Sequence, residues 1–124
     1  MRDMTLEEIC FFVAGALDCL VRLYDALGIT GKESIVAQFA LLRMNDRILG
    51  SYNFDTASIL HDSYKSKSNT IICMRGYPLD EWRSSFKNIG VEMIKEILYR
   101  FQWMDPPDGW ILHFVEKLLN RDFR

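Results

Sequence analysis

The residues that could carry out chemistry are few, and their spacing matches no complete site. His113 and Glu116 stand three positions apart, which would put both side chains on one face of a helix. Helical carboxylate metal sites also need inward-facing Glu residues on a matching helix, and the sequence has no such set. Glu92 and Glu96 share a helical face too, but with Lys95 beside them they are typical of a solvated surface. The sequence therefore predicts no metal site and no cofactor.

Motifs that carry a catalytic mechanism are missing. The chain has no Gly-rich phosphate loop, no Gly-x-Ser-x-Gly turn and no His-Glu-x-x-His pair. Its three cysteines, Cys10, Cys19 and Cys73, are odd in number and form no Cys-x-x-Cys pair, so we expect free thiols in a reducing compartment. We assign no catalytic residue from the sequence and expect a protein without enzymatic activity.

One group of polar side chains stands out within the apolar segment 9–27. Its only charged residues are Asp18, Arg22 and Asp25, and spacings of four and three place them on one stripe of a helix. If this stripe faces solvent, the helix is a core or interface element. If it faces inward, Asp18, Arg22 and the nearby Tyr24 would line a small-molecule pocket between helices. Both alternatives stay open at this point.

Aromatic residues are abundant, with eight Phe, five Tyr and three Trp. Phe101, Trp103, Met104 and Trp110 surround a rigid Pro106–Pro107 corner. Aromatic and Met side chains are enriched at the cores of interfaces, which makes Trp103 and Trp110 candidate binding residues. The same side chains could instead close one end of the hydrophobic core, and the sequence favours neither interpretation.

The first element that must position these residues is a helix from Thr5 to Leu27. Thr5 and Glu8 form a Thr-x-x-Glu capping box, and Gly28 can end the helix in the left-handed conformation. The charged stripe would cost ~2.5 to 3.5 kcal/mol per residue near the centre of a bilayer, which argues against a membrane span. Small residues around Gly15 would let a second helix cross closely.

A second helix is predicted from Ser34 to Leu42. The Thr30–Glu33 segment has the spacing of another capping box, and Ile35, Phe39 and Leu42 recur at helical intervals. The connection to the first helix is short, so we expect the two helices to form an antiparallel hairpin.

The middle of the chain, residues 45–77, shows no sustained periodicity. Thr56–Tyr64 could form a short helix. Thr70–Met74 is rich in residues that favour β structure and predicts a buried strand. Its mate could be Arg47–Tyr52 or a strand of a second chain, and an extended buried loop fits the segment equally well.

Helical periodicity returns after Pro78. The apolar residues of Trp82–Phe101 predict one helix, or two helices separated by a break near Asn88 and Gly90. Trp82 is expected to anchor this region in the core. A last helix is predicted over Asp105–Asn120, with the Asp as its N-cap and the following Pro in its first turn.

Composition bounds the fold and the partners. With 124 residues, 49% of them hydrophobic and 26% charged, the chain is expected to form one domain over residues 1–124. We predict a mainly α fold, with α+β as the alternative, in which four to five helices pack around the central apolar N-terminal helix and at most a short strand pair occupies the middle third. The net charge of −2 and the lack of a basic patch argue against nucleic-acid binding.

Abundant apolar and aromatic residues, without catalytic motifs, favour a protein that binds another protein. We expect a small cytosolic interaction or regulatory protein that self-associates as a homodimer and also binds a protein partner. Acidic Glu7 and Glu8 stand where a signal peptide would carry basic residues. The alternative is a small-molecule-binding protein or enzyme with a pocket between helices. We expect no nucleic-acid or membrane partner.

Overall fold

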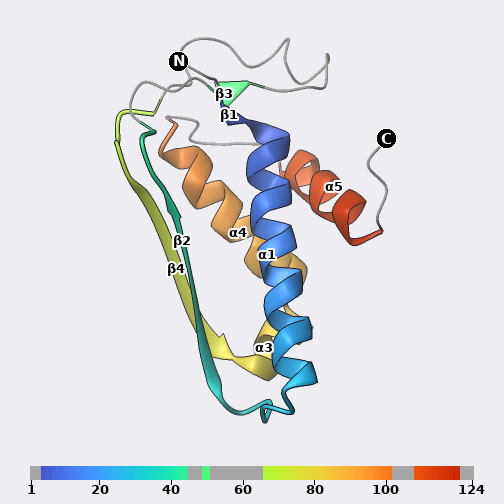
Figure 1. Cartoon of the computed structure of the whole chain (residues 1–124). Helices are drawn as coiled ribbons and strands as arrows, with labels where there is room; N and C mark the ends of the chain where they lie inside the picture. Colours follow the sequence, from blue (N-terminus) through green and yellow to red (C-terminus); the bar gives the residue numbers. More distant parts are fainter. Residues whose placement is uncertain (1–3, 45–48, 51–65, 102–107, 121–124) are drawn as a thin grey trace.

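The computed structural model describes residues 4–44, 49–50, 66–101 and 108–120 (Figure 1). More than half of the described residues are helical, in four helices, and an antiparallel pair of strands accompanies them. This agrees with a mainly α or α+β composition. No helix in the described part of the chain is both long and apolar enough to cross a membrane.

Helix α1 spans Leu6–Ala26 and begins and ends where the sequence predicts. The backbone N–H of Glu8 donates to the Thr5 Oγ1 at 3.1 Å, and the Thr5 hydroxyl donates to the Glu8 carboxylate at 3.1 Å. At the other end Gly28 has a φ of 70°, the left-handed conformation that favours glycine after a helix. Both predicted end signals of this helix are confirmed.

The segment after α1 is a strand and not the predicted helix. Strand β2 spans Ser34–Leu41 and pairs antiparallel with β4, Ile71–Pro78. Alternate β2 side chains are buried and exposed, which is the period of a strand with one covered face. Helical and strand spacings both fit the apolar residues of this segment, and pairing with β4 makes the strand the more stable choice. The predicted helical hairpin of α1 with residues 34–42 is therefore wrong.

The strand predicted at Thr70–Met74 is confirmed as part of β4, and of the alternatives left open for this segment neither pairing with Arg47–Tyr52 nor an extended loop is found in the described part of the chain. Its partner is β2, whereas the described part of Arg47–Tyr52, Leu49–Gly50, forms β3 and pairs parallel with β1, Met4–Thr5. The helix predicted at residues 56–64 lies outside the described residues.

Three helices complete the described chain: α3 (Leu79–Ser84), α4 (Phe86–Tyr99) and α5 (Asp108–Leu119). The break between α3 and α4 falls at Ser85, so its predicted position near Asn88 and Gly90 is wrong. Gly90 stays inside α4, where a Cβ would lie 3.7 Å from the Leu17 Cδ1 of α1. This distance is an ordinary van der Waals contact, so α4 packs against α1 at this position.

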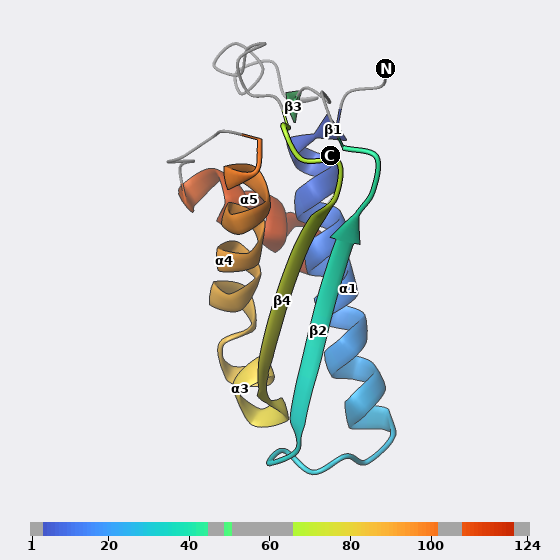
Figure 2. The same ribbon diagram turned by 90° about the vertical axis from the view of Figure 1, so that its left-hand side faces the viewer.

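The described elements form three layers (Figures 1 and 2). The β2–β4 sheet is one outer layer, α1 and α4 lie behind it, and α5 covers the opposite side. The Trp82 indole N–H donates to the Ile35 carbonyl at 2.9 Å, so Trp82 joins α3 to β2 as a fully buried anchor. The largest fully buried side chains come from α1, β4, α3, α4 and the turn after α4. They are Leu6, Ile9, Leu17, Ile71, Leu79, Trp82, Met93, Ile94, Ile97, Leu98 and Phe101.

Candidate functional site

The charged stripe of α1, Asp18, Arg22 and Asp25, forms its ion pairs within the chain. Arg22 Nε donates to Asp18 Oδ1 at 3.1 Å. The Arg83 guanidinium of α3 donates two hydrogen bonds to Asp25, one of them from Nε at 2.7 Å, and a third to Asp80 Oδ1 at 2.9 Å. The hydrogen bonds to Asp25 raise the pKa of the Arg83 guanidinium. Arg22 and Asp25 are therefore exposed to solvent, whereas the Asp18 side chain is only 17% exposed and borders a gap between helices.

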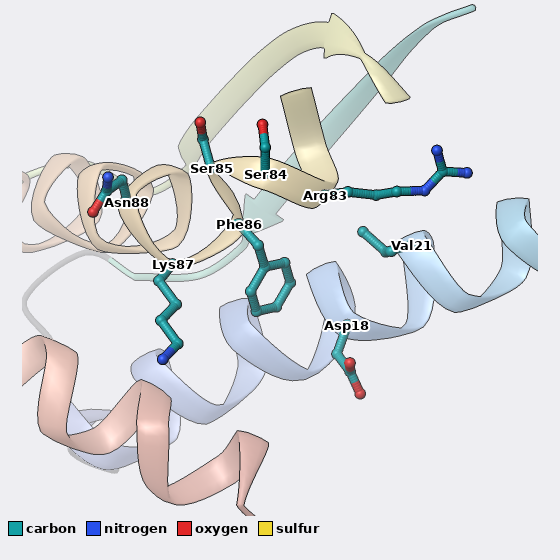
Figure 3. A pocket seen from close by; sticks show the side chains of 8 residues that line it. All are labelled: Asp18, Val21, Arg83, Ser84, Ser85, Phe86, Lys87 and Asn88. Atoms are coloured by element: carbon teal, nitrogen blue, oxygen red, sulfur yellow. The ribbon is translucent and has the colours of Figure 1, made fainter. Parts of the chain in front are cut away.

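A cavity of about 510 Å³ lies between α1 and the junction of α3 with α4 (Figure 3). Asp18 lines it, but neither Arg22 nor Tyr24 is among its lining residues. The cavity residues come from both sides of the gap: Asp18, Val21, Arg83, Ser84, Ser85, Phe86, Lys87 and Asn88. Of the predicted site residues, Asp18 therefore lines the cavity. The other side is formed by residues 83–88, which the sequence did not indicate as part of a pocket.

The polar groups of this cavity do not converge on one point. Figure 3 shows the Ser84 and Ser85 side chains pointing away from Lys87 and Asp18. Lys87 Nζ lies 3.6 Å from Glu116 Oε1 of α5 and is held in an ion pair. A nucleophile needs a base within hydrogen-bond reach, and the cavity provides no such pair. It can hold a small polar molecule, but it does not assemble a catalytic group.

The predicted aromatic residues are only partly within the described chain. Tyr24 of α1 and Trp110 of α5 are half-buried and pack against the hydrophobic core. Trp103 lies outside the described residues, so its pairing with Trp110 around the Pro106–Pro107 corner stays a prediction. Among the predicted binding residues, Asp18 and Arg22 are joined by a hydrogen bond.

The acidic and histidine pairs do not gather into a metal centre. His113 is exposed and lies against the Phe114 ring, while Glu116 pairs with Lys87. Glu96 accepts a hydrogen bond from Arg75 Nη1 at 3.2 Å. Among the described residues, no group of three His, Cys, Asp or Glu side chains is placed to hold a metal ion.

A second stripe on α1 consists of apolar side chains that are exposed. Phe12 is 48% exposed, Leu23 55% and Leu27 62%, and Cys19 is exposed between them. Intervals of seven, four and four residues correspond to about two, one and one helical turns, so these four side chains share one face. We call Phe12, Cys19, Leu23 and Leu27 the apolar stripe. It is separate from the buried face of the helix and from the charged stripe.

The apolar stripe begins beside strand β2. The Phe12 and Phe39 rings meet edge to face with centroids 5.4 Å apart. Phe12 also lines a hollow of about 250 Å³ with Glu8, Ile9 and Leu41. Figure 2 shows α1 behind the β2 side of the sheet, while α4 lies behind the β4 side. Phe12, at one end of the apolar stripe, therefore lies next to β2.

The three thiols differ in accessibility. Cys10 and Cys73 are buried, and Cys19 is exposed. Burial raises the pKa of Cys73 to about 12, and a hydrogen bond with Glu96 adds to the shift. Burial, followed by the nearby charge of Glu7, also raises the pKa of Cys10. The buried thiols are thus protonated at neutral pH and poor nucleophiles.

Sequence reasoning found the charged stripe but missed the apolar stripe. The signal was present, because Phe12, Leu23 and Leu27 occur at helical spacing. It did predict that a second helix crosses near Gly15, and α5 lies there: a Cβ on Gly15 would be 3.6 Å from Leu118 Cδ2, an ordinary van der Waals distance. Which of the remaining apolar faces stays uncovered depends on how the whole chain packs.

No family model, curated protein or solved structure matches this chain.

Proposed function

We propose that this protein works by binding another protein through the apolar stripe of α1, and that it self-associates as a homodimer. The observation that supports the proposal is the row of Phe12, Cys19, Leu23 and Leu27 exposed along α1, with Phe12 next to Phe39 of β2. Contiguous exposed apolar side chains are unfavourable in water and mark interaction sites. Because each large side chain is already about half buried, covering its exposed part on association would contribute roughly 1 kcal/mol.

The same proposal covers the role and location of the protein. We propose a non-enzymatic, regulatory protein of the cytoplasm in which α1 is the central packing element and which has no nucleic-acid or membrane partner. Three free cysteines fit a reducing compartment, and a net charge of −2 offers little attraction to phosphate backbones.

Sedimentation equilibrium over about 1 μM to about 500 μM protein tests this function. We expect the mass to rise from one chain toward two. Replacing both Leu23 and Leu27 by Glu should weaken association at least about tenfold, because it places charges in the buried contact. Arg22→Glu changes the net charge by the same two units outside the apolar stripe and should leave the association constant within about twofold.

A mass of one chain over the whole range would contradict self-association. If Arg22→Glu and the double Glu variant weaken association equally, the contact does not lie on the apolar stripe. Circular dichroism of each variant shows whether the helices are retained.

The cavity of about 510 Å³ supports a second candidate, small-molecule binding between α1 and the α3–α4 junction. Its volume is in the range of small-ligand sites, roughly 300 to 1,000 Å³. Val21→Trp would place a large ring from α1 in the gap, since the Val21 side chain points toward the α3–α4 segment (Figure 3). If a small molecule raises the melting temperature of the wild-type chain but not that of Val21→Trp, the cavity is a ligand site.

A further inference from the structure

The hydrogen-bond pattern of the sheet determines which backbone groups point outward from β2. Ser34 is opposite Pro78, which has no N–H, and the Leu79 N–H donates to the Glu33 carbonyl at 2.9 Å. Ser34 and Pro78 are therefore a pair that exchanges no hydrogen bonds. Because such pairs alternate with hydrogen-bonded pairs along an antiparallel ladder, every second residue of β2 directs its N–H and C=O away from β4. These residues are Ser34, Val36, Gln38 and Ala40, and their outward groups are called here the β2 edge.

The two edges of this sheet differ in how they resist pairing with another strand. β4 contains Arg75, Gly76 and Pro78, which are residue types that weaken or block an added strand. β2 has the sequence Ser-Ile-Val-Ala-Gln-Phe-Ala-Leu, without charge, proline or glycine over eight residues. A long uncharged edge strand of this kind is a template for strand addition.

We propose that β2 pairs antiparallel with β2 of a second copy of this chain, giving one sheet with the strand order β4-β2-β2-β4. This inference rests on the proposed self-association and adds its geometry. Antiparallel pairing of two identical strands has twofold symmetry, so one surface satisfies itself. It also puts both α1 helices on the same side of the joined sheet, where the added strand and helix cover the apolar stripe.

Charge supports a second copy as the occupant. The protein carries 15 basic and 17 acidic residues, yet β2 and the apolar stripe contribute none of them. Two uncharged surfaces meet without repulsion and without burying an unpaired charge. The eight strand residues and the four stripe residues fall short of the ~20 to 30 residues per side of a standard interface, so we expect a dimer that dissociates in the micromolar range.

Amide hydrogen exchange of the unaltered protein, followed by NMR, tests the pairing directly. In a sample that sedimentation shows to be dimeric, the N–H groups of Val36, Gln38 and Ala40 should exchange at least about tenfold more slowly than those of Ile72, Met74 and Gly76. The latter three point outward at the opposite edge. Dilution to the monomer should remove the difference.

Each outcome separates the two proposals. Equal exchange at both edges in a dimeric sample would overturn strand pairing and leave self-association standing. A monomeric mass at every concentration means that the proposed function has failed. Slow exchange of Val36, Gln38 and Ala40 in a monomer would mean that another segment of the same chain covers the β2 edge. Pairing with a second copy would then be wrong.

A pair of proline variants gives an independent test. Gln38 and Met74 are directly opposite in the register, and the N–H of each points to its own outer edge. Gln38→Pro and Met74→Pro therefore each remove one outward donor and no hydrogen bond between β2 and β4. We expect Gln38→Pro to raise the dimer dissociation constant at least about tenfold, and Met74→Pro to change it less than about threefold.

An equal effect of the two substitutions would overturn edge pairing, because association through the outer face of the sheet depends on both strands. The exchange experiment needs no substitution, so the proposal stays falsifiable if either proline variant fails to fold.

Discussion

Helix α1 carries a charged stripe and an apolar stripe, which differ in whether their side chains have partners in the same chain. The charged stripe has its partners in the same chain, since Asp18 pairs with Arg22 and Asp25 pairs with Arg83. The apolar stripe has Phe12 against Phe39 at one end, while Leu23 is more than half exposed farther along the helix. A charged side chain is stable in water, but an exposed apolar row is not. The apolar stripe, and not the charged stripe, is therefore the face of α1 that would be stabilised by binding a partner.

The buried face of α1 gives the reference for the largest expected effect. Leu17 is fully buried and lies beside Gly90 of α4. Leu17→Ala should lower the free energy of unfolding by about 2 to 5 kcal/mol, because it removes apolar contacts and leaves a cavity. Leu23→Ala, measured at a concentration where the chain is monomeric, should cost only about 0.5 kcal/mol. Urea denaturation measures both.

In an association assay the ranking of the two variants should be reversed, with the larger direct effect on dimer formation coming from Leu23→Ala. Leu23→Ala should weaken the dimer, whereas any loss of dimer in Leu17→Ala should follow its loss of folded protein. Equal losses of unfolding free energy would mean that Leu23 is covered in the monomer, and the distinction between the buried face and the apolar stripe would be wrong.

The end signals of α1 could be predicted because they are local. Thr5 and Glu8 are three residues apart, and the left-handed Gly28 follows the last turn directly. β2 could not be assigned in the same way, because Ile35 and Phe39 fit both a helix and a strand. Its mate, Ile71–Pro78, lies about thirty residues later, and long-range pairing decided between two local patterns of similar merit.

Part of the candidate site could also be predicted. The spacing of Asp18 and Arg22 placed them on one face of a helix, and their hydrogen bond is present. Their direction could not be deduced, because it depends on where α3, α4 and α5 pack against α1. The exposure of Leu23 and Leu27 has the same origin: a helical sequence shows which side chains share a face, but not which face remains uncovered.

Cysteine reactivity offers a second way to compare the faces, with a smaller perturbation than a core substitution. Cys19 is on the apolar stripe, while Cys10 and Cys73 are buried and their pKa values are raised by burial. With an aromatic disulfide reagent at pH 8, one thiol per chain should react at least about 100-fold faster than the other two, which should react only as the chain opens.

The dependence of the Cys19 labelling rate on protein concentration tests whether the apolar stripe is the dimer contact. If the apolar stripe is the contact, the rate at Cys19 should fall as the dimer forms, while denaturant should make all three thiols react. Mass spectrometry identifies the labelled residue. A Cys19 rate that is the same in monomer and dimer would place the contact elsewhere on the surface.

The smallest effects are expected from the charged stripe. Arg22→Ala removes one exposed pair with Asp18, spaced four residues apart, and should lower the free energy of unfolding by only about 0.3 to 0.5 kcal/mol. Added salt should reduce the difference from the wild-type chain, because ions screen exposed charges. Urea denaturation at low and high salt measures this change, and sedimentation should give the wild-type association constant. A large loss of association in Arg22→Ala would reverse the comparison, because the stripe whose charges are already paired within the chain would then be the contact surface.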